Sequence, residues 1–570
     1  MPGADRIPDD EWRLDDKSSE RAEHEPRLVP LITETAVNLS HERLTRAVYV
    51  VTAEHLGWYL VAVYALVTRA IALGARPLDA VDARDALAAL AIATHGRAAL
   101  ASGAGLHASW VAILQGWIFA AAGATDATSR IVVMLCGLLT VASGFVMRPF
   151  IGRAGALAFA ALIAISPSVT YFSRGGSTAI ASIAFMMIAI AIAETMRRQP
   201  GLVRAAGLGV AIALWLSADP IGYVSAAAMI VSLIFVGAGD AMRIDHLRLR
   251  LRVSWERRRV LVIVCAIVAA SLWLLLTTAF FTRPLATVAG YDLRAAFVPP
   301  SIAFGRFVLR LLPILAIYEF IIVTLAIAGA FAILSRRIGD RFAVWSMVWA
   351  FVSLVMLAAA GANRSDAVLA SLLPLTILAA YGLDWMHQSE RWNSIRYAIA
   401  AGVALTLYVQ LAVNFVHPAP DTSEAPWRRH ALLFWSEPAT SIQTVRECRR
   451  AGNAVSTAGA SAMIPDDNQT PQVRWYLRDF ALTDSPAAAN IVVTIGKTQS
   501  GALAGNPDAP DFGFEEWWTP DFGTLTIVGA IRYLLTQRAW SDVEIRDLEI
   551  AIPRPDSMPS AATRGEIEDK

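Results

Sequence analysis

The sequence predicts a mainly α, polytopic membrane protein of about 11 transmembrane helices, followed by a C-terminal extracytoplasmic α/β domain. Three observations carry this prediction. Of the 570 residues, 56% are hydrophobic and only 17% are charged. Apolar runs of about 20 residues recur, each long enough to cross a bilayer as a helix. Beyond residue 417, Pro, Asp, Glu and Asn become frequent and the apolar runs shorten.

Each predicted span is an apolar run bounded by charged or turn-forming residues. A helix satisfies its own backbone hydrogen bonds in lipid, which irregular chain cannot do. The runs cover residues 56–75, 128–147, 154–172, 177–196, 203–217, 221–238, 260–281, 308–334, 342–361, 366–386 and 397–416.

Basic loops orient these spans. Every second loop between the predicted spans is rich in arginine, so these loops all lie on the same side of the membrane. The positive-inside tendency places them on the cytoplasmic side of the plasma membrane. These segments are residues 148–153, 197–204, 243–259, 335–340 and 389–396. The apolar segment 107–123 would reverse this agreement if it spanned the membrane. Because it carries Gln115 between Trp110 and Trp117, we interpret it as a juxtamembrane helix.

This topology divides the chain into four parts. Residues 1–45 are charged and contain proline, which predicts a disordered cytoplasmic tail. Residues 46–417 form the transmembrane domain, in which residues 76–127 make one large outer loop. Residues 418–555 are expected to form the extracytoplasmic α/β domain, and residues 556–570 a second disordered tail.

Short segments predict the elements of the C-terminal domain. Residues 451–459, 490–497 and 543–553 are predicted strands. Residues 470–480, "TPQVRWYLRDF", predict a short helix with a proline near its start. The aromatic rings of "FEEWWTP", at 514–520, either pack in the domain core or serve as a platform for a sugar or a membrane surface.

Charge and cysteine content exclude several classes of function. A formal net charge of +1 gives no reason to expect a nucleic-acid partner. Cys136 and Cys265 lie within apolar runs, and Cys448 stands alone in a polar region. The three cysteines therefore form neither a disulfide framework nor a metal-binding pattern.

The outer loop after the first span holds three aspartates. Asp79, Asp82 and Asp85 are spaced i, i+3, i+6, so on a helix they project from roughly one face. Like charges at this spacing repel, and a cation is needed to offset them. The three acids are the candidate catalytic residues. The alternative is that Asp79 caps a helix and the other two are solvated.

The order of features in this region resembles that of the GT-C membrane glycosyltransferases, in particular the protein mannosyltransferase-like group. The matching residues are Pro77, Leu78, Asp82, His107, Gly123, Asp126 and Arg130. The resemblance implies that a sugar is moved from a polyprenyl-phosphate carrier to an acceptor at the outer face of the membrane.

A narrower resemblance, to the "flippase activity-associated" branch of this superfamily, covers nearly the whole chain. It is carried by residues 152–174, which end in "YFSR", by "WYLRDF" at 475–480, by "WWTP" at 517–520 and by "YLLTQR" at 533–538. No single segment is specific, but the four occur in the expected order.

The chain departs from this branch at two places. The branch carries a second Arg and then an Asp shortly after "SR", where this chain has Ser177 and Ala179. The usual acidic pair of the first loop is reduced to Asp82, preceded by Val81. One expected acid is therefore missing beside the flexible sequence "SRGGS".

The implied chemistry assigns roles to the candidate residues. Asp82 would accept the proton of the acceptor hydroxyl, with Asp79 and Asp85 as electrostatic support. The predicted substrate contacts are Tyr171, His107, Arg174, Arg294 and Arg364. Arginine suits the donor phosphate because it forms forked, charge-assisted contacts. For each of these contacts the alternative is a structural role, such as an arginine that reaches to the membrane interface.

Cofactors and partners follow from the same reasoning. A divalent metal normally takes two or more carboxylate oxygens, so with Ala179 in place of an acid any metal site would depend on the three loop acids. The sequence therefore establishes no metal ion or other cofactor. The expected partners are a polyprenyl-phosphate-linked sugar, a glycan, lipid or protein acceptor, and the lipid bilayer.

The altered "SRGGSTA" sequence leaves a second hypothesis open. The protein would then be a catalytically silent GT-C-like membrane protein that assists the handling or flipping of lipid-linked glycans. A secondary transporter is less consistent with the sequence, because most spans lack central charges and no broken-helix repeats are evident.

Overall fold

The computed structural model describes most of the chain, with gaps at both ends and in several loops. It describes residues 52–102, 109–240, 244–282, 311–335, 340–360, 365–389, 392–416, 439–455, 460–464, 470–485, 488–495, 511–518, 520–541 and 543–552. The predicted tails at 1–45 and 556–570 lie outside these residues and stay predictions.

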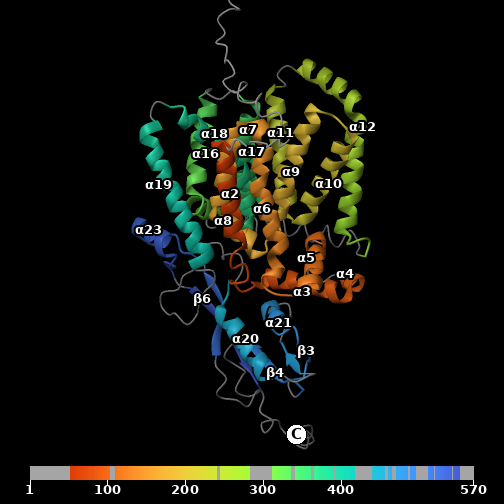
Figure 1. The fold of residues 1–570 in the computed structure, drawn as a ribbon, viewed down its shortest axis with the longest axis vertical. Helices are drawn as coiled ribbons and strands as arrows, with labels where there is room; N and C mark the ends of the chain where they lie inside the picture. The colour runs from red at the N-terminus through yellow and green to blue at the C-terminus, as the bar shows by residue number, and fades with distance from the viewer. Residues whose placement is uncertain are drawn as a thin grey trace, which may run out of the picture. The chain divides into compact units, whose positions relative to one another are not determined.

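Helices dominate the described chain up to residue 416 (Figure 1). They are α2 (Ala53–Ala70), α3 (Ala80–His95), α4 (Arg97–Ser102), α5 (Ser109–Ala122), α6 (Ile131–Val146), α7 (Arg148–Ile165), α8 (Pro167–Gly175), α9 (Ala179–Arg198), α10 (Leu202–Ala218), α11 (Ile221–Asp240), α12 (Ile244–Thr277), α15 (Leu312–Ile317), α16 (Phe320–Leu334), α17 (Arg341–Ala360), α18 (Leu369–His387) and α19 (Trp392–Leu411). Short 3₁₀ segments, Thr128–Arg130 and Ser365–Val368, precede α6 and α18, and a π-helical turn, Ala412–Val416, follows α19.

The predicted class, a polytopic helical membrane protein, is confirmed. Every predicted span overlaps a described helix, and seven of the described helical segments are long and apolar enough to cross a membrane. Shorter apolar helices, including α10, α11 and α16, accompany them. The predicted outer loop, residues 76–127, is largely helical where the structure describes it, because it contains α3, α4 and α5.

Two predicted spans are broken rather than continuous. The span at 154–172 divides at Ser166, which has extended backbone and caps α8 by accepting a hydrogen bond from the Val169 amide at 3.2 Å. Pro167 follows at the first helical position, where its missing N–H costs nothing. Hydropathy alone does not register this capping signal, and the single-helix prediction was therefore wrong.

The second break lies between α15 and α16, and Glu319 connects it to the first. Glu319 is fully buried, and its Oε1 accepts hydrogen bonds from the Ser166 hydroxyl at 2.7 Å and the Ser168 amide at 2.9 Å. A buried carboxyl in an apolar segment needs such partners. Glu319 therefore holds the first turn of α8, the helix that carries Tyr171 and Arg174.

Small residues allow close helix packing at the centre of the bundle. Gly329 of α16 and Gly382 of α18 face one another so closely that a Cβ on either would collide with a backbone carbonyl of the other helix. This is a common way for membrane helices to approach. Most of α18 is buried, and it forms part of the core of the helical domain.

The C-terminal region contains a six-stranded mixed sheet in the order β1-β5-β6-β4-β2-β3. Strand β2 pairs in parallel with β3 and β4, and the remaining pairs are antiparallel. The elements are β1 (Ala439–Thr440), α20 (Ile442–Ala454), β2 (Ser461–Met463), α21 (Pro471–Tyr476), β3 (Ala481–Leu482), β4 (Ile491–Ile495), β5 (Asp511–Trp518), α23 (Ile527–Thr536) and β6 (Val543–Ala551).

Several predictions for this region are confirmed. The strands at 490–497 and 543–553 are β4 and β6, and the helix at 470–480 is α21. The strand predicted at 451–459 was wrong where the structure describes it, because residues 451–454 are the end of α20. Trp518 of "FEEWWTP" is buried and packs edge-on against Trp540, so this ring belongs to the core.

Candidate active site

The first turn of α3 places two of the three loop acids. Asp79 is the N-cap, and its Oδ1 accepts a hydrogen bond from the Asp82 amide at 2.9 Å. Its Oδ2 lies 2.7 Å from Nη2 of Arg76. Asp82 is 9% exposed, so it is not the solvated acid that the alternative interpretation expected. Asp85, one turn further along, is half-buried.

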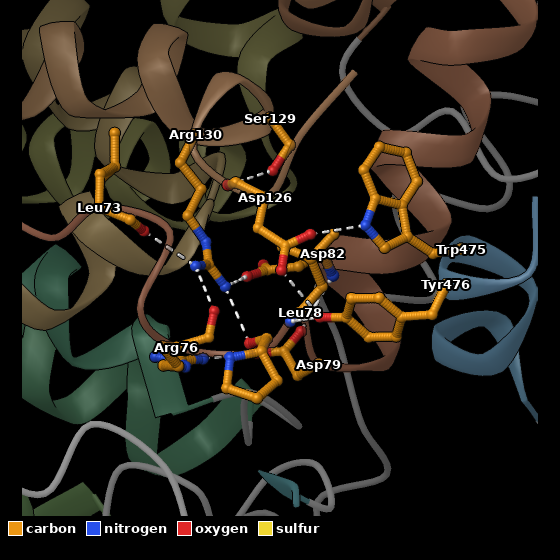
Figure 2. Close-up of polar contacts among 11 residues, drawn as sticks. Leu73, Arg76, Leu78, Asp79, Asp82, Asp126, Ser129, Arg130, Trp475 and Tyr476 are labelled. Carbon is orange, nitrogen blue, oxygen red and sulfur yellow. Dashed lines mark hydrogen bonds and ion pairs between the residues drawn. The ribbon is translucent and has the colours of Figure 1, made fainter. Parts of the chain in front are cut away.

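Arg130 contacts both the chain that precedes these acids and Asp82 itself (Figure 2). Its guanidinium donates to three backbone carbonyls of the preceding turn, at Leu73, Arg76 and Pro77. Nη2 also lies 3.3 Å from Oδ2 of Asp82. Arg130 is 1% exposed, so these contacts are shielded from solvent. One buried side chain therefore sets both the path of the loop and the position of the Asp82 carboxylate.

Two glycines at the end of α8 make room for this cluster. Gly176 has a left-handed backbone, with φ +87°, and a Cβ placed on it would stand 2.8 Å from Oδ1 of Asp82. A Cβ on Gly175 would stand 3.1 Å from Nη1 of Arg76. The "RGGS" sequence thus lets Asp82 and Arg76 approach the backbone at the end of α8.

Tyr171 and Arg174 lie on the same short helix. The Arg76 guanidinium stacks over the Tyr171 ring at 4.4 Å from its centroid. Arg174 is 8% exposed and donates to the carbonyls of Thr68, Ile71 and Ala72, at 2.7 to 3.1 Å. These bonds fix α8 to the C-terminal end of α2. A direct contact between Arg174 and a phosphate therefore stays a prediction.

Two aspartates from distant parts of the chain accept hydrogen bonds from Ser177 and Thr178, the residues that follow the glycines. Ser177 donates to Oδ2 of Asp366 at 2.6 Å, and Thr178 donates to Oδ2 of Asp219 at 2.5 Å. Both aspartates are buried. The acid expected at Ala179 is absent from the sequence, but two carboxylates reach the same turn from elsewhere in the fold. Sequence analysis missed this, although both acids lie at polar breaks between apolar runs.

The surroundings of Asp82 alter its protonation. Burial raises the pKa of Asp82 to about 8, and the nearby charge of Asp79 acts in the same direction. Arg130 and Arg76 oppose this shift without cancelling it. A carboxyl with a pKa near the working pH can accept and release a proton, which suits a general base.

The C-terminal domain contacts this loop directly through "WYLRDF". Trp475 Nε1 donates to Oδ1 of Asp126 at 2.7 Å, and the Tyr476 hydroxyl donates to Oδ2 at 3.1 Å (Figure 2). The same hydroxyl accepts the Leu78 amide at 3.0 Å, one residue before the α3 cap. Burial and Asp126 raise the pKa of Tyr476 above its usual range, so the hydroxyl stays protonated. Sequence analysis singled out this motif but did not show that it contacts Asp126.

A cavity of ≈ 880 Å³ opens beside this contact. Its walls come from the outer loop, including Asp126, and from the C-terminal domain. Arg449, Asn453 and Asp479 contribute polar side chains, and Phe480 contributes an aromatic ring. The cavity is large enough for a small ligand, and its lining mixes hydrogen-bonding groups with apolar surface.

The described residues contain no group of three or more His, Cys, Asp or Glu side chains placed to hold a metal ion. Three of the predicted substrate contacts, His107, Arg294 and Arg364, lie outside the described residues. Their roles therefore stay predictions.

Comparison with known proteins gives a fold rather than a close relative. No family model matches the sequence, and a search of curated proteins found no match. The crystal structure of ArnT from Cupriavidus metallidurans bound to undecaprenyl phosphate aligns with TM-score 0.53 and 12% identity, over 88% of this chain and 99% of ArnT. The apo structure of the same protein gives TM-score 0.52 and 13% identity, with the same coverage.

The chain has the GT-C fold. An oligosaccharyltransferase from Archaeoglobus fulgidus aligns more weakly, with TM-score 0.40 and 13% identity over 76% of this chain and 63% of that protein. In this fold the loop between α2 and α6 meets the end of α8, where Arg76 pairs with Asp79 and stacks on Tyr171, and Asp82 lies against Gly176. The narrower resemblance to the flippase activity-associated branch stays a prediction.

Proposed function

We propose that this protein is a glycosyltransferase of the plasma membrane, which transfers a sugar from a polyprenyl-phosphate donor to an acceptor on the extracytoplasmic face. The observation that carries the proposal is the buried Asp82 carboxylate, held between Arg130 and the glycines that end α8. The GT-C fold supports it, because the ArnT structure that shares this fold contains undecaprenyl phosphate.

Asp82 is proposed as the general base. The acceptor hydroxyl oxygen forms a bond to the anomeric carbon of the donor sugar, and the bond from that carbon to the phosphate oxygen breaks. The electron pair leaves with the carrier phosphate, and the hydroxyl proton passes to Asp82. Such proton transfer typically contributes about 10²–10⁴ in rate.

Asp79 and Asp85 are proposed to support this step without direct proton transfer. Asp79 lies 2.7 Å from Arg76 and caps the helix that carries Asp82. Its negative charge also helps to raise the pKa of Asp82. Asp85 adds negative charge from the next turn of the same helix.

The donor phosphate is proposed to bind near Arg76 and Tyr171, at the end of α8. Arg174 of α8, which is held by carbonyls at the end of α2, contributes its positive charge. Charge-assisted hydrogen bonds, such as those between arginine and phosphate, are roughly twice as strong as neutral ones. The acceptor is proposed to approach through the cavity beside Asp126, with His107, Arg294 and Arg364 as further candidate contacts.

Carrier release tests the proposal. Purified protein in liposomes is supplied with a panel of polyprenyl-phosphate-linked sugars and a cell-envelope extract as acceptor, and free polyprenyl phosphate is measured by mass spectrometry. We expect release from at least one donor. Folded protein that releases no carrier from any donor would contradict the proposal and favour the catalytically silent alternative.

A further inference from the structure

Helix α23 has two apolar faces, and only one of them is covered. The Tyr533 hydroxyl is buried 2.6 Å from that of Tyr318, which lies between α15 and α16. Four other large residues remain exposed, namely Ile527 at 83%, Val528 at 75%, Ile531 at 52% and Leu535 at 51%.

The exposed residues form one continuous strip. At 3.6 residues per turn, the four side chains fall within an arc of about 100°, and Tyr533 projects from the opposite side of the helix. Exposed apolar surfaces of this kind mark sites that interact with a membrane, another protein or a ligand.

The position of α23 indicates what covers the strip. Tyr408 of α19 donates a hydrogen bond to the Leu535 carbonyl. The apolar segment of α19 continues past Tyr408 to Val416. Its later apolar residues Leu411 and Val416 are also exposed, at 45% and 64%. The exposed strip of α23 therefore continues the exposed apolar surface at the end of α19.

We propose that α23 is an interfacial helix that inserts its exposed strip into the lipid bilayer beside α19. A helix whose exposed face is apolar can lie in the membrane interface, where a neighbouring cation favours anionic head groups. Arg532 supplies such a cation from the edge of the strip, between Ile531 and Tyr533. The proposal does not depend on transfer activity, so the two can fail separately.

The aromatic segment "FEEWWTP" then has a supporting role. The Trp518 ring lies 5.6 Å from the Tyr533 ring, and both are buried. Trp518 thus packs behind α23 rather than meeting the membrane itself. Under this proposal the membrane contact in this region is made by α23, and Trp518 supports the helix from inside the protein.

Depth-dependent fluorescence quenching tests the proposal. Ile531→Cys is labelled with the fluorophore NBD in a chain whose other cysteines are replaced, and the protein is reconstituted in phosphatidylcholine–phosphatidylglycerol vesicles. Leu411→Cys in α19 is the lipid-facing control, and Ser485→Cys, exposed near β3, is the aqueous control. Circular dichroism and thermal unfolding check that each labelled protein is folded.

We expect NBD at position 531 to behave like the probe at 411. Its emission shifts to shorter wavelength, and lipids with a nitroxide near the head group quench it more than aqueous iodide does. Quenching by iodide but not by nitroxide lipids, as at 485, would overturn the proposal. So would energy transfer between copies labelled at 531, which would assign the strip to a second copy of the chain.

Discussion

The carboxylate of Asp82 lies against Gly176, at a distance that leaves no room for a side chain on the glycine. The two residues are far apart in the sequence, one in the first turn of α3 and the other just after α8. Their contact explains why a flexible, polar segment interrupts the apolar sequence at this point. It brings the candidate base to the end of the helix that carries Tyr171 and Arg174.

Gly176→Ala should disturb this contact. A left-handed alanine costs about 1–2 kcal/mol, and its Cβ would also displace Asp82. Because misplacing a catalytic group by about 1 Å can cost about 100-fold in rate, we expect a loss of this order in carrier release. Gly96→Ala is the matched control, since Gly96 also has positive φ, +57°, but has open space around it. Equal rates for the two variants would contradict the proposed contact.

Tyr476→Phe tests the contact between the C-terminal domain and the outer loop. The variant keeps the ring and loses the hydroxyl that bridges Leu78 and Asp126. We expect faster hydrogen exchange of the Leu78 amide and about tenfold slower transfer, equivalent to about 1.4 kcal/mol.

Tyr381→Phe is the control for that variant, because it also removes a buried hydroxyl, but one that bonds to the Phe150 carbonyl and to Asp340, at the opposite end of α7 from α8. Both variants should lose stability, by about 1–3 kcal/mol. Only Tyr476→Phe should slow transfer. Unchanged exchange at Leu78 would show that the hydroxyl does not hold the start of α3.

Thr178→Val tests the hydrogen bond from Thr178 to Asp219, in the turn that follows the two glycines. The substitution removes the hydroxyl that donates to Asp219, a buried carboxylate. We expect the free energy of unfolding to fall by about 1–3 kcal/mol, measured by thermal denaturation in detergent. Thr195→Val, whose hydroxyl bonds only to its own helix at an exposed position, should change stability little. Similar losses in the two variants would count against a special role for Asp219.

The pH dependence of transfer follows from the pKa of Asp82. A general base must be ionised, so the rate should fall as the pH drops below about 8. Asp79→Asn removes a negative charge that raises this pKa, while asparagine still caps the helix. The rising limb of the profile of kcat/KM should therefore move to lower pH. A limb that stays in place, or moves upward, would contradict the assignment of Asp82 as the titrating group.

Much of the fold could be predicted because apolar helices are locally determined. Each of the long apolar runs contains its own signal, and the strands β4 and β6 were evident from their β-branched residues. The break at Ser166 was missed because hydropathy continues across it, although the Ser-Pro pair is a local helix-start signal. The strand predicted at 451–459 was wrong for its described residues, because an amphipathic helix, α20, extends through Ala454.

The site was harder to predict because it depends on contacts between distant segments. The sequence singled out Asp79, Asp82 and the "SRGG" turn, and the structure places them together. It could not show that Arg174 bonds to the carbonyls at the end of α2, or that Asp219 and Asp366 reach Ser177 and Thr178. Such pairings leave no mark on local composition or spacing.

The most direct test of the central claim, that Asp82 is the base for sugar transfer, is the rate of carrier-phosphate release by Asp82→Asn. We expect this variant to insert and fold normally and to lose about 10²–10⁴ in rate. Asp484→Asn, at an exposed position in the C-terminal domain, should keep the wild-type rate. Wild-type release by folded Asp82→Asn protein would contradict the account.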